Sequence, residues 1–441
     1  MKKLIPAISL ALVAMTLAAA NPYPIVQTSY IADPAPMVYN DTVFLYTTHD
    51  EDDADGFKMF DWLLYTSTDM VNWTDHGAVA SLRNFAWNPR DNGAWAEQVV
   101  ERDGKFYMYC PIHGNGIGVL VADSPYGPFK DPIGKPLVWQ KEHWNDIDPT
   151  VLIDDDGQAY MYWGNPDLYC VRLNSDMVST AGEIMKFPKI TDYQEGPWIW
   201  KCNGRYYLAF ASTCCPEGIG YAMGDSPLGP WEYKGHIMDH SPRSNGNHPG
   251  IIDYKGKSYV FGLSYEVLRL QTPQHHERRS VEAAEMTYND DGTIRELPFW
   301  RDTDLNPCGT LDPYRRVEAE TMAWGYGLKN GRIDDRNMYV GNTGKGKHIL
   351  VRNVDFGSKS PRRFLMNAAS VRDGGMIELR VDAPDGRLIG LMVIDRTGAA
   401  DKYGLNDCTV NDITGIHDLY FVFSGEGTEE LYRLDWWKFE K

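Results

Sequence analysis

The chain has 441 residues, a formal net charge of −18 and an aromatic content of 12%. A chain of this length favours two or three domains over one. The negative charge argues against a nucleic-acid partner, because a negative long-range field repels a phosphate backbone. The many aromatic side chains suit a soluble protein that acts on a neutral ligand, since aromatic faces hold sugar rings or flat bases as well as packing strands.

The first 20 residues have the pattern of an export signal. Lys2 and Lys3 precede a mostly apolar run over residues 4–17, and three alanines at 18–20 form a small-residue cleavage site. The apolar run is too short to favour a membrane span, and no other stretch is long and apolar enough for one. We therefore predict maturation near Asn21 and a secreted or periplasmic protein that is not held in a membrane.

From Asn21 to about Pro298 the chain has the pattern of many short strands. Five segments rich in aromatic and β-branched residues each follow a tight turn that contains Asn, Asp or Gly, which is a strong hairpin signal. These segments are residues 43–46, 106–109, 159–162, 206–208 and 259–261. No stretch of useful length has the period of a helix.

One polar residue opens each of these hairpins, and the openings recur at intervals of roughly fifty residues. A unit of this length, built from four short strands, is typical of a propeller blade. The repeat therefore predicts a five-bladed β-propeller over residues 21–300. Because the innermost strands border the central channel, we expect the opening residues to form a ring around the axis: Asp33, Glu97, Asp148, Glu195 and His248.

The pattern changes after Trp300. Residues 301–314 are polar and contain proline and glycine, so they are predicted to be a linker. Residues 315–441 form a second all-β segment with Gly-rich turns and alternating apolar residues, which predicts one β-sandwich of the jelly-roll kind. The whole chain is thus predicted to be all-β, with a signal peptide at 1–20, a propeller at 21–300 and a sandwich at 315–441.

The predicted ring contains the groups that hydrolysis of a glycosidic bond requires. One carboxylic acid protonates the leaving oxygen, and a second carboxylate attacks the sugar or activates water, so their pKa values must differ. Glu195 has the longer reach suited to the proton donor, and an ionised Asp148 beside it would raise its pKa. Taken alone, Asp33-Pro or Asp148-Pro is more often a turn starter, but recurrence in one phase of the repeat favours catalysis.

The sequence leaves two interpretations open for several other residues. His248 is equally well read as a satisfied inner histidine or as a contact to a channel metal or the substrate, and Glu97 is more simply a polar residue that lines the channel. The acidic run at 50–53 either borders the pocket or is a solvated loop, and the solvated loop is the favoured interpretation. The tryptophans that flank the ring either stack on a sugar or pack the blades: Trp95, Trp144 and Trp198.

The seven cysteines are odd in number and fit no zinc-ligand spacing, so we read most of them as small buried hydrophobes. A disulfide between the adjacent Cys214 and Cys215 is a minor alternative.

The spacing of Asp33-Pro-Ala-Pro, Asp148-Pro-Thr and Glu195-Gly-Pro, followed by His248-Pro-Gly, resembles glycoside hydrolase family 43 over residues 24–300. The resemblance implies a five-bladed propeller that inverts the anomeric centre. It implies that Asp33 is the general base, that Glu195 is the general acid, and that Asp148 tunes and orients the acid. It also implies that His248 lies on the axis, often beside a bound calcium ion.

Two further points follow from this resemblance. The stretch Arg278-Arg279-Ser280-Val281 resembles the late basic motif of the family, which places Arg279 near the substrate. The second blade departs from the usual Trp-Ala-Pro-Asp, because this chain has Trp95-Ala96-Glu97-Gln98 there. The departure is expected to alter the leaving-group side of the pocket. Trp95 and Trp198 are predicted to be sugar-binding residues, together with His248 and Arg279.

Residues 315–441 resemble a family 6 carbohydrate-binding module, through Val317-Glu318-Ala319-Glu320 at the start and Leu434-Asp435-Trp436-Trp437 at the end. The resemblance implies a structural calcium ion held by Glu318, Glu320 and Asp435, whose hard oxygen ligands suit that ion. The sugar cleft departs from the family at residues 347–351, 402–405 and 433. The module is therefore read either as a structural partner of the propeller or as a binder through another edge.

Together these features imply an exo-acting, inverting enzyme that releases terminal α-L-arabinofuranose from arabinoxylan-type hemicellulose. Calcium is the expected cofactor, with no organic cofactor, and the expected partners are plant cell-wall polysaccharides or oligosaccharides met by a monomer. A β-D-xylosidase or bifunctional enzyme on xylo-oligosaccharides is a close alternative, because the two pentoses present similar hydroxyls. A non-catalytic glycan-binding propeller is an alternative of another class, although a binding module needs no base–acid pair.

Overall fold

A computed structural model describes residues 24–140, 145–243, 247–300, 303, 305–426 and 429–441. The predicted signal peptide at 1–20 and Trp144 lie outside the described residues. Among these described ranges the chain is nearly all β, with one short α-helix, α1 (Glu266–Gln271). Within them, no helix is both long enough and apolar enough to cross a membrane.

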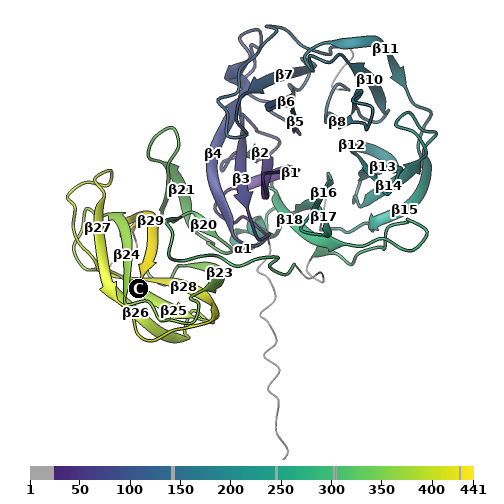
Figure 1. Cartoon of the computed structure of the whole chain (residues 1–441). Coiled ribbons are helices and arrows are strands. Elements are labelled where there is room, and N and C mark those ends of the chain that lie inside the picture. Colours follow the sequence, from purple (N-terminus) through teal and green to yellow (C-terminus); the bar gives the residue numbers. More distant parts are fainter. Residues whose placement is uncertain (1–23, 141–144, 244–246, 301–302, 304, 427–428) are drawn as a thin grey trace, which may run out of the picture.

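Five antiparallel sheets surround a common axis (Figure 1), which confirms the predicted propeller. The first blade contains β1 (Tyr30–Tyr39), β2 (Thr42–Asp50), β3 (Asp61–Ser67) and β4 (Trp73–Ser81). The second contains β5 (Gln98–Arg102), β6 (Lys105–Pro111) and β7 (Ile117–Ala122). The third contains β8 (Thr150–Ile153), β9 (Ala159–Trp163), β10 (Tyr169–Leu173) and β11 (Thr180–Lys186).

The last two blades complete the ring. The fourth contains β12 (Tyr193–Cys202), β13 (Arg205–Ser212), β14 (Ile219–Gly224) and β15 (Glu232–Met238). The fifth contains β16 (Gly250–Tyr254), β17 (Lys257–Ser264) and β18 (Ser280–Met286). In the described part of the chain the second and fifth sheets thus have three strands, where the repeat predicted four. After β7 the chain is rich in proline, which has no N–H to donate to a ladder.

The N-terminal segment closes the ring of blades. The backbone N–H of Ile25 donates to the carbonyl of Val281 in β18, and that of Ile31 donates to the carbonyl of Arg279 just before β18, both at 3.1 Å. The start of the described chain therefore completes the last blade before it enters β1. As a result the first and last blades are joined by backbone hydrogen bonds.

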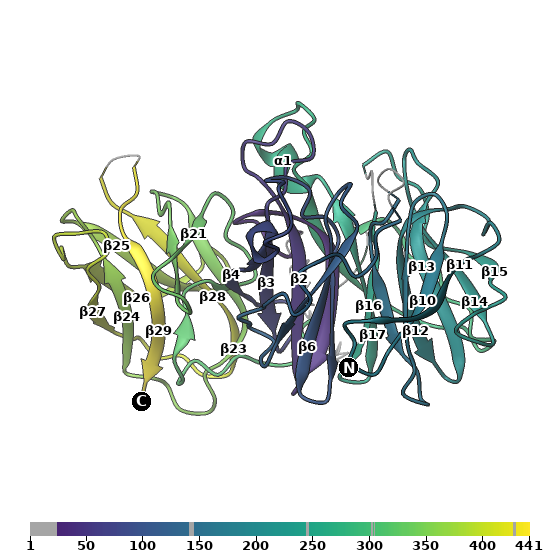
Figure 2. The ribbon, with the colours of Figure 1, turned by 90° about the horizontal axis from the view of Figure 1, so that it is seen from above.

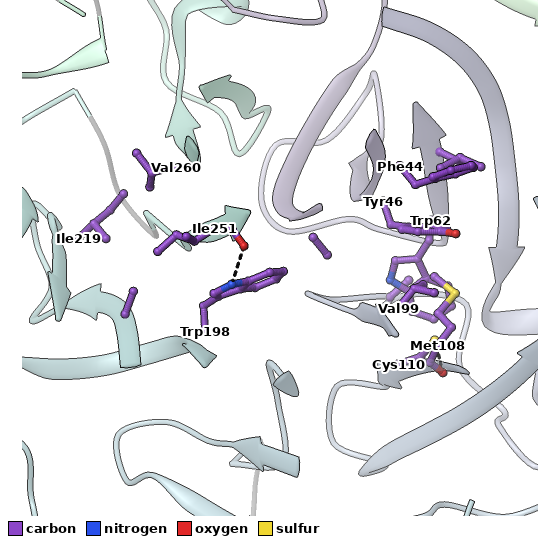
Figure 3. Packing of buried hydrophobic residues seen from close by; sticks show 14 of the residues in the cluster. Phe44, Tyr46, Trp62, Val99, Met108, Cys110, Trp198, Ile219, Ile251 and Val260 are labelled. Atoms are coloured by element: carbon purple, nitrogen blue, oxygen red, sulfur yellow. Dashed lines mark hydrogen bonds between the residues drawn. The ribbon is translucent and has the colours of Figure 1, made fainter. Parts of the chain in front are cut away.

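The first strand of each blade lies at the edge of its sheet, and these five strands meet around the axis: β1, β5, β8, β12 and β16. Large buried side chains fill the space between blades (Figure 3). One of them, Trp198, donates from Nε1 to the carbonyl of Ile251 at 3.1 Å and so links the fourth blade to the fifth. This packing holds the start of each inner strand close to the starts of the neighbouring inner strands.

The C-terminal part is a two-sheet sandwich. Its first sheet contains β21 (Lys329–Arg332), β22 (Met338–Gly341), β29 (Arg433–Glu440), β24 (Arg363–Ala369) and β27 (Gly404–Thr409), and β19 (Val317–Glu318) pairs with β29. Its second sheet contains β23 (His348–Asp355), β28 (Ile416–Ser424), β25 (Gly375–Val381) and β26 (Arg387–Ile394). Buried and partly exposed residues alternate along β25, as expected for a strand with one face on the core.

The sandwich packs directly against the first blade (Figure 2). Strand β20 (Thr321–Met322) pairs with β4 and becomes a fifth strand of that blade. Asn72 and Arg352 exchange two hydrogen bonds of 2.8 Å across the contact, and Lys329 pairs with Asp52 at 2.6 Å. The two parts therefore share a sheet and several polar contacts.

Candidate active site

A cavity of about 900 Å³ lies where the mouths of the inner strands converge. Aromatic side chains from several loops form part of its wall, including Phe57 and Trp139. Most of the residues singled out from the sequence border this cavity: Asp33, Trp95, Asp148, Glu195, His248 and Arg279.

Local backbone geometry determines how the acidic groups reach the cavity. Asp33 and Asp148 have positive φ angles of 50° and 57°, and each precedes a proline. In the fourth blade the equivalent residue before proline is Gly196, with φ of 57°, so Glu195 lies one position earlier. Register shifts in β1 and β12 accompany this change, as is common beside active sites. Glu195 therefore lies two residues before its proline, whereas Asp33 and Asp148 each lie one residue before theirs.

The carboxylate of Asp33 has a fixed position. Thr48 donates from Oγ1 to its Oδ2 at 2.6 Å, and Arg279 donates from Nη1 to its Oδ1 at 3.0 Å. Arg279 is itself held by Asp50, through Nε at 3.0 Å and Nη2 at 2.8 Å. Asp50 is fully buried, so the expectation that this acidic stretch is solvated is wrong for its first residue. The buried partner is needed because an arginine cation inside a protein is costly unless it is paired.

His248 lies between the base and the acid. Its Nδ1 is 3.2 Å from Asp33 Oδ1, whereas its Nε2 is 3.4 Å from Glu195 Oε1 and 3.9 Å from Asp148 Oδ2. The side-chain amide of Asn165 donates to the second oxygen of Glu195. Asp33 and Glu195 therefore contact different nitrogens of one imidazole ring, with Asp148 on the side of the acid.

The charges of this cluster influence one another strongly. Burial, reinforced by the neighbouring carboxylates, raises the pKa of Asp148 to about 7. Burial alone would lower the pKa of His248, but Asp148, Asp33 and Glu195 raise it to about 10. Burial alone would raise the pKa of Glu195, but the hydrogen bond and charge of His248 lower it. In the free site the raised carboxyl pKa therefore belongs to Asp148, and not to Glu195 as we expected from the sequence.

Asp148 and Glu195 are best treated as a pair of coupled groups. Each offers an oxygen within 4.8 Å of the other and of a His248 nitrogen. Interacting sites of this kind lose protons in steps that belong to the pair. The Gly196 N–H also donates to Asp148 Oδ2 at 3.1 Å, which holds that carboxyl against the strand of the acid. The cluster can therefore store a proton next to Glu195 up to about neutral pH.

Trp198 does not line the large cavity. The residue is 7% exposed, and its ring packs in the core between blades, where it forms the hydrogen bond to Ile251 shown in Figure 3. The prediction that Trp198 binds the sugar is therefore wrong. The register shift between Glu195 and Trp198 in β12 separates the orientation of the ring from that of the acid.

Glu97 also lies away from the large cavity. It borders a separate cavity of about 20 Å³ together with Asp33, Asp148 and His248. Both of its carboxylate oxygens are buried, and neither has a hydrogen-bond partner among the described residues. Burial raises the pKa of Glu97 well above its ordinary value. Glu97 thus lies next to the catalytic set but outside the large cavity.

Several cavity residues had no clear signal in the sequence. Asn165 comes from a loop after β9, and its contact with Glu195 joins residues that are 30 positions apart. A disulfide joins Cys214 and Cys215 in the cavity wall, an outcome that the sequence supports only as a minor alternative. Trp95 is confirmed as a cavity residue, and one face of its ring is stacked on His113 with a centroid distance of 3.9 Å.

Comparison with known proteins places this geometry in context. The model of Glycosyl hydrolases family 43 matches residues 22–294, and that of Carbohydrate binding module (family 6) matches residues 318–441. The arabinoxylan arabinofuranohydrolase of Bacillus subtilis (strain 168) is 32% identical, over 95% of this chain and 92% of its own length.

Solved structures agree with these matches. A family 43 arabinoxylan arabinofuranohydrolase from Bacillus subtilis, in complex with cellotetraose, has a TM-score of 0.84 and 30% identity and covers 95% of this chain and 97% of its own. A β-xylosidase/α-arabinofuranosidase from a compost microbial metagenome, solved with xylotriose in a calcium-free form, has a TM-score of 0.56 and 28% identity. It covers 63% of this chain and 98% of its own.

Proposed function

We propose that this chain, which belongs to glycosyl hydrolase family 43 and is an inverting glycoside hydrolase, releases terminal α-L-arabinofuranose from arabinoxylan-type hemicellulose. The observation that carries the proposal is the meeting of Asp33, Asp148 and Glu195 around His248 in one cavity. The cavity, at about 900 Å³, is far larger than one pentose needs, so it has room for part of the chain that bears the branch.

The reaction uses the two carboxyl groups on opposite sides of the sugar. Glu195 donates a proton to the departing glycosidic oxygen, while Asp33 accepts a proton from the water that attacks the anomeric carbon. An inverting reaction needs these groups about 6.5–9.5 Å apart, so that the water fits between base and sugar. Contact with different nitrogens of His248 supports this wider spacing over the close pair of a retaining enzyme.

The surrounding residues prepare the pair for this chemistry. Arg279 and Thr48 orient Asp33, so we assign Arg279 to positioning the base, beside any contact that it makes with the substrate. Asp148 holds the proton that the pair shares, and its place on the side of the acid lets it supply Glu195. Trp95, Phe57 and Trp139 offer apolar surface for the faces of sugar rings.

The experiment measures which sugar is released from two substrates. We expect wild-type protein to release arabinose from arabinoxylan, and proton NMR of the first product to show the inverted β-anomer. Dominant release of xylose from xylotriose would favour the β-xylosidase alternative, which the name of the compost relative supports. Binding of both glycans without release of either sugar would favour the non-catalytic propeller.

We also propose a calcium ion in the propeller channel. The residues fit such an ion, because the small cavity beneath His248 contains two buried oxygens of Glu97 that have no hydrogen-bond partner among the described residues. Hard carboxylate oxygens are the ligands that calcium prefers. Glu97 would hold the ion through its carboxylate oxygens, with His248 next to the ion, and the positive charge of the ion would offset the negative groups that surround the axis.

A second calcium ion is proposed for the sandwich, where the predicted ligands fit unequally. Glu320 is buried, and its Oε2 has no partner among the described residues, so it fits the ion well. Glu318 is instead paired with Arg316 at 2.8 Å, and the same guanidinium lies 3.5 Å from Asp435. Glu320 would therefore be the principal ligand, and Glu318 and Asp435 would have to release Arg316 to join it.

We further propose that the protein is exported and acts as a monomer on plant cell-wall glycans. The basic, apolar and alanine-rich order of residues 1–20 supports export. N-terminal sequencing of protein from the culture fluid and the periplasm would locate the mature start, expected near Asn21. Light scattering on a sizing column would show whether the mass corresponds to one chain of about 50.0 kDa or less.

A further inference from the structure

We propose that the fourth blade carries a zinc-binding site formed by Asp192, His236 and His240, apart from the catalytic cluster. Asp192 directly precedes β12, His236 lies in β15, and His240 follows β15 by two residues. One ligand atom from each of the three lies within 4.8 Å of the others. Residues that are far apart along the chain are thus brought together by the pairing of strands within one blade.

The donor set has the chemistry of a zinc site. Two imidazoles and a carboxylate are ligands that zinc takes in proteins, with a water or a further carboxylate in the fourth position. Asp239 lies next to the histidines, with its Oδ1 3.0 Å from His240 Nδ1 and 3.8 Å from His236 Nδ1, but it is not one of the three mutually close ligands, so water is the expected fourth ligand. The centres of the two imidazole rings are 4.9 Å apart. The mixture of nitrogen and oxygen donors favours zinc over calcium, which prefers oxygen alone.

Neighbouring groups hold these ligands in place. Asp192 Oδ2 is 2.9 Å from His236 Nε2, and Ser212 Oγ is 2.9 Å from His240 Nε2. Tyr233 OH lies 3.3 Å from His236 Nε2. Hydroxyl partners such as Ser212 orient metal-binding histidines in known sites, whereas Asp192 is itself one of the three proposed ligands. These contacts also give the polar atoms of the site hydrogen-bond partners in the absence of an ion.

The site is reachable from solvent and close to the catalytic cavity. The side chains of Asp192, His236 and His240 are 19%, 21% and 33% exposed, so an ion can enter without opening the blade. The Thr213 N–H donates to Asp192 Oδ1 at 3.2 Å, and the next residues, Cys214 and Cys215, line the catalytic cavity. A bound zinc ion would join the start of β12 to the end of β15 and support this part of the cavity wall.

The test is a zinc titration of the full chain after treatment with a chelator. Calorimetry should show one zinc ion bound per chain, and the affinity should fall at least tenfold in His236→Ala and in His240→Ala. His417→Ala is the matched control, because His417 is a partly exposed histidine of the sandwich that contacts Asp382 at 2.9 Å. It should bind zinc as wild type does. Circular dichroism without metal checks that each variant is folded.

Three results would overturn the proposal. The first is the absence of stoichiometric zinc binding by the wild type. The second is an equal loss of affinity in His417→Ala, which would mean adventitious binding to surface histidines. The third is loss of binding in Cys214→Ser/Cys215→Ser with retention in His236→Ala, which would move the ion to the cavity wall.

Cobalt provides a readout that does not depend on any variant. Co²⁺ added to the wild-type chain should give the visible absorption of a four-coordinate site with nitrogen and oxygen ligands, and zinc should displace it. A sulfur-to-metal charge-transfer band would instead indicate a cysteine ligand and would contradict the proposal. Because all these measurements report binding, their outcome is independent of whether the enzyme releases arabinose.

Discussion

The carboxylates of Asp33 and Glu195 contact the two different nitrogens of His248, and their other neighbours preserve this arrangement. Arg279 fixes the base from one side, and Asn165 fixes the acid from the other. Each contact by itself is an ordinary hydrogen bond or ion pair. Their combined effect is a base and an acid that keep separate positions in a buried site, which an inverting glycosidase requires.

Removal of the acid and removal of the base should have different consequences. Glu195→Gln should lower kcat/KM on arabinoxylan by about 10²–10⁴, because a general acid contributes about this much. It should lower activity far less on a nitrophenyl arabinofuranoside, whose leaving group needs no proton. Asp33→Asn should lower activity on both substrates, because water remains unactivated. Asp53→Asn, which alters an exposed loop carboxylate, is the control. Equal losses of activity on the two substrates in Glu195→Gln would contradict the assigned roles.

The pH dependence should report the shared proton. A proton donor works only while it is protonated, so activity should be present below the pKa and be lost as the pH rises through it. The pKa of Asp148, raised to about 7, places the fall of kcat/KM near neutral pH. Asp148→Asn has no carboxyl proton and should move this fall away from pH 7. The measurement is kcat/KM against pH for the wild type and the variant. If kcat/KM of Asp148→Asn falls at the same alkaline pH as that of the wild type, the prediction is wrong.

At the scale of elements, the mouth of the β12–β13 hairpin determines where the acid lies. Gly196 allows the positive φ that turns the strand between Glu195 and Pro197, and its Cα faces the ring of His248. An added Cβ there would lie 2.8 Å from His248 Cγ, closer than real Cβ contacts. The glycine thus serves both the backbone turn and the close approach of the imidazole.

Two glycines of this hairpin provide a matched pair of variants. Gly204, at the other end, also has a positive φ, of 76°, but an added Cβ would have no heavy atom within 4 Å. Both Gly196→Ala and Gly204→Ala should therefore lose about 1 kcal/mol or more of stability from backbone strain. Only Gly196→Ala should also displace His248 and lower kcat. Thermal melts and steady-state kinetics measure the two effects, and full activity in Gly196→Ala would show that His248 tolerates the shift.

At the scale of the whole molecule, the sandwich and the first blade are joined. Strand β20 pairs with β4, and Asn72 and Lys329 form polar contacts between the two parts. A cavity of about 10 Å³ at this interface contains Glu320 from the sandwich and Asp75 from the propeller. Burial raises the pKa of Glu320 well above its ordinary value, with Glu318 and Asp75 adding to the shift. Two buried carboxyl groups that line one small cavity explain why a cation at this place would stabilise the assembly.

Removal of calcium should therefore lower the melting temperature of the full chain. A ligand at about a hundredfold excess over its Kd stabilises the folded state by about 2.7 kcal/mol, and a chelator removes this contribution. Glu320→Gln should abolish the part of the fall in melting temperature that is due to the ion in the sandwich. Glu97→Gln should abolish the part that is due to the ion in the channel. Scanning calorimetry with and without chelator separates the two. A chelator effect of equal size in the double variant would show that calcium binds elsewhere.

The amino-acid sequence alone determined the repeat, the five polar openings and the three carboxylates, because turn dipeptides and alternating strands are local patterns. It did not determine what each opening faces. The one-residue offset of Glu195, the inward turn of Trp198 and the burial of Asp50 all depend on bulges and on partners far along the chain. The pair of Asp50 and Arg279, for example, spans 229 positions. Only the closed ring of blades brings such residues together, so the tertiary structure decided which polar groups act, which support them and which merely pack.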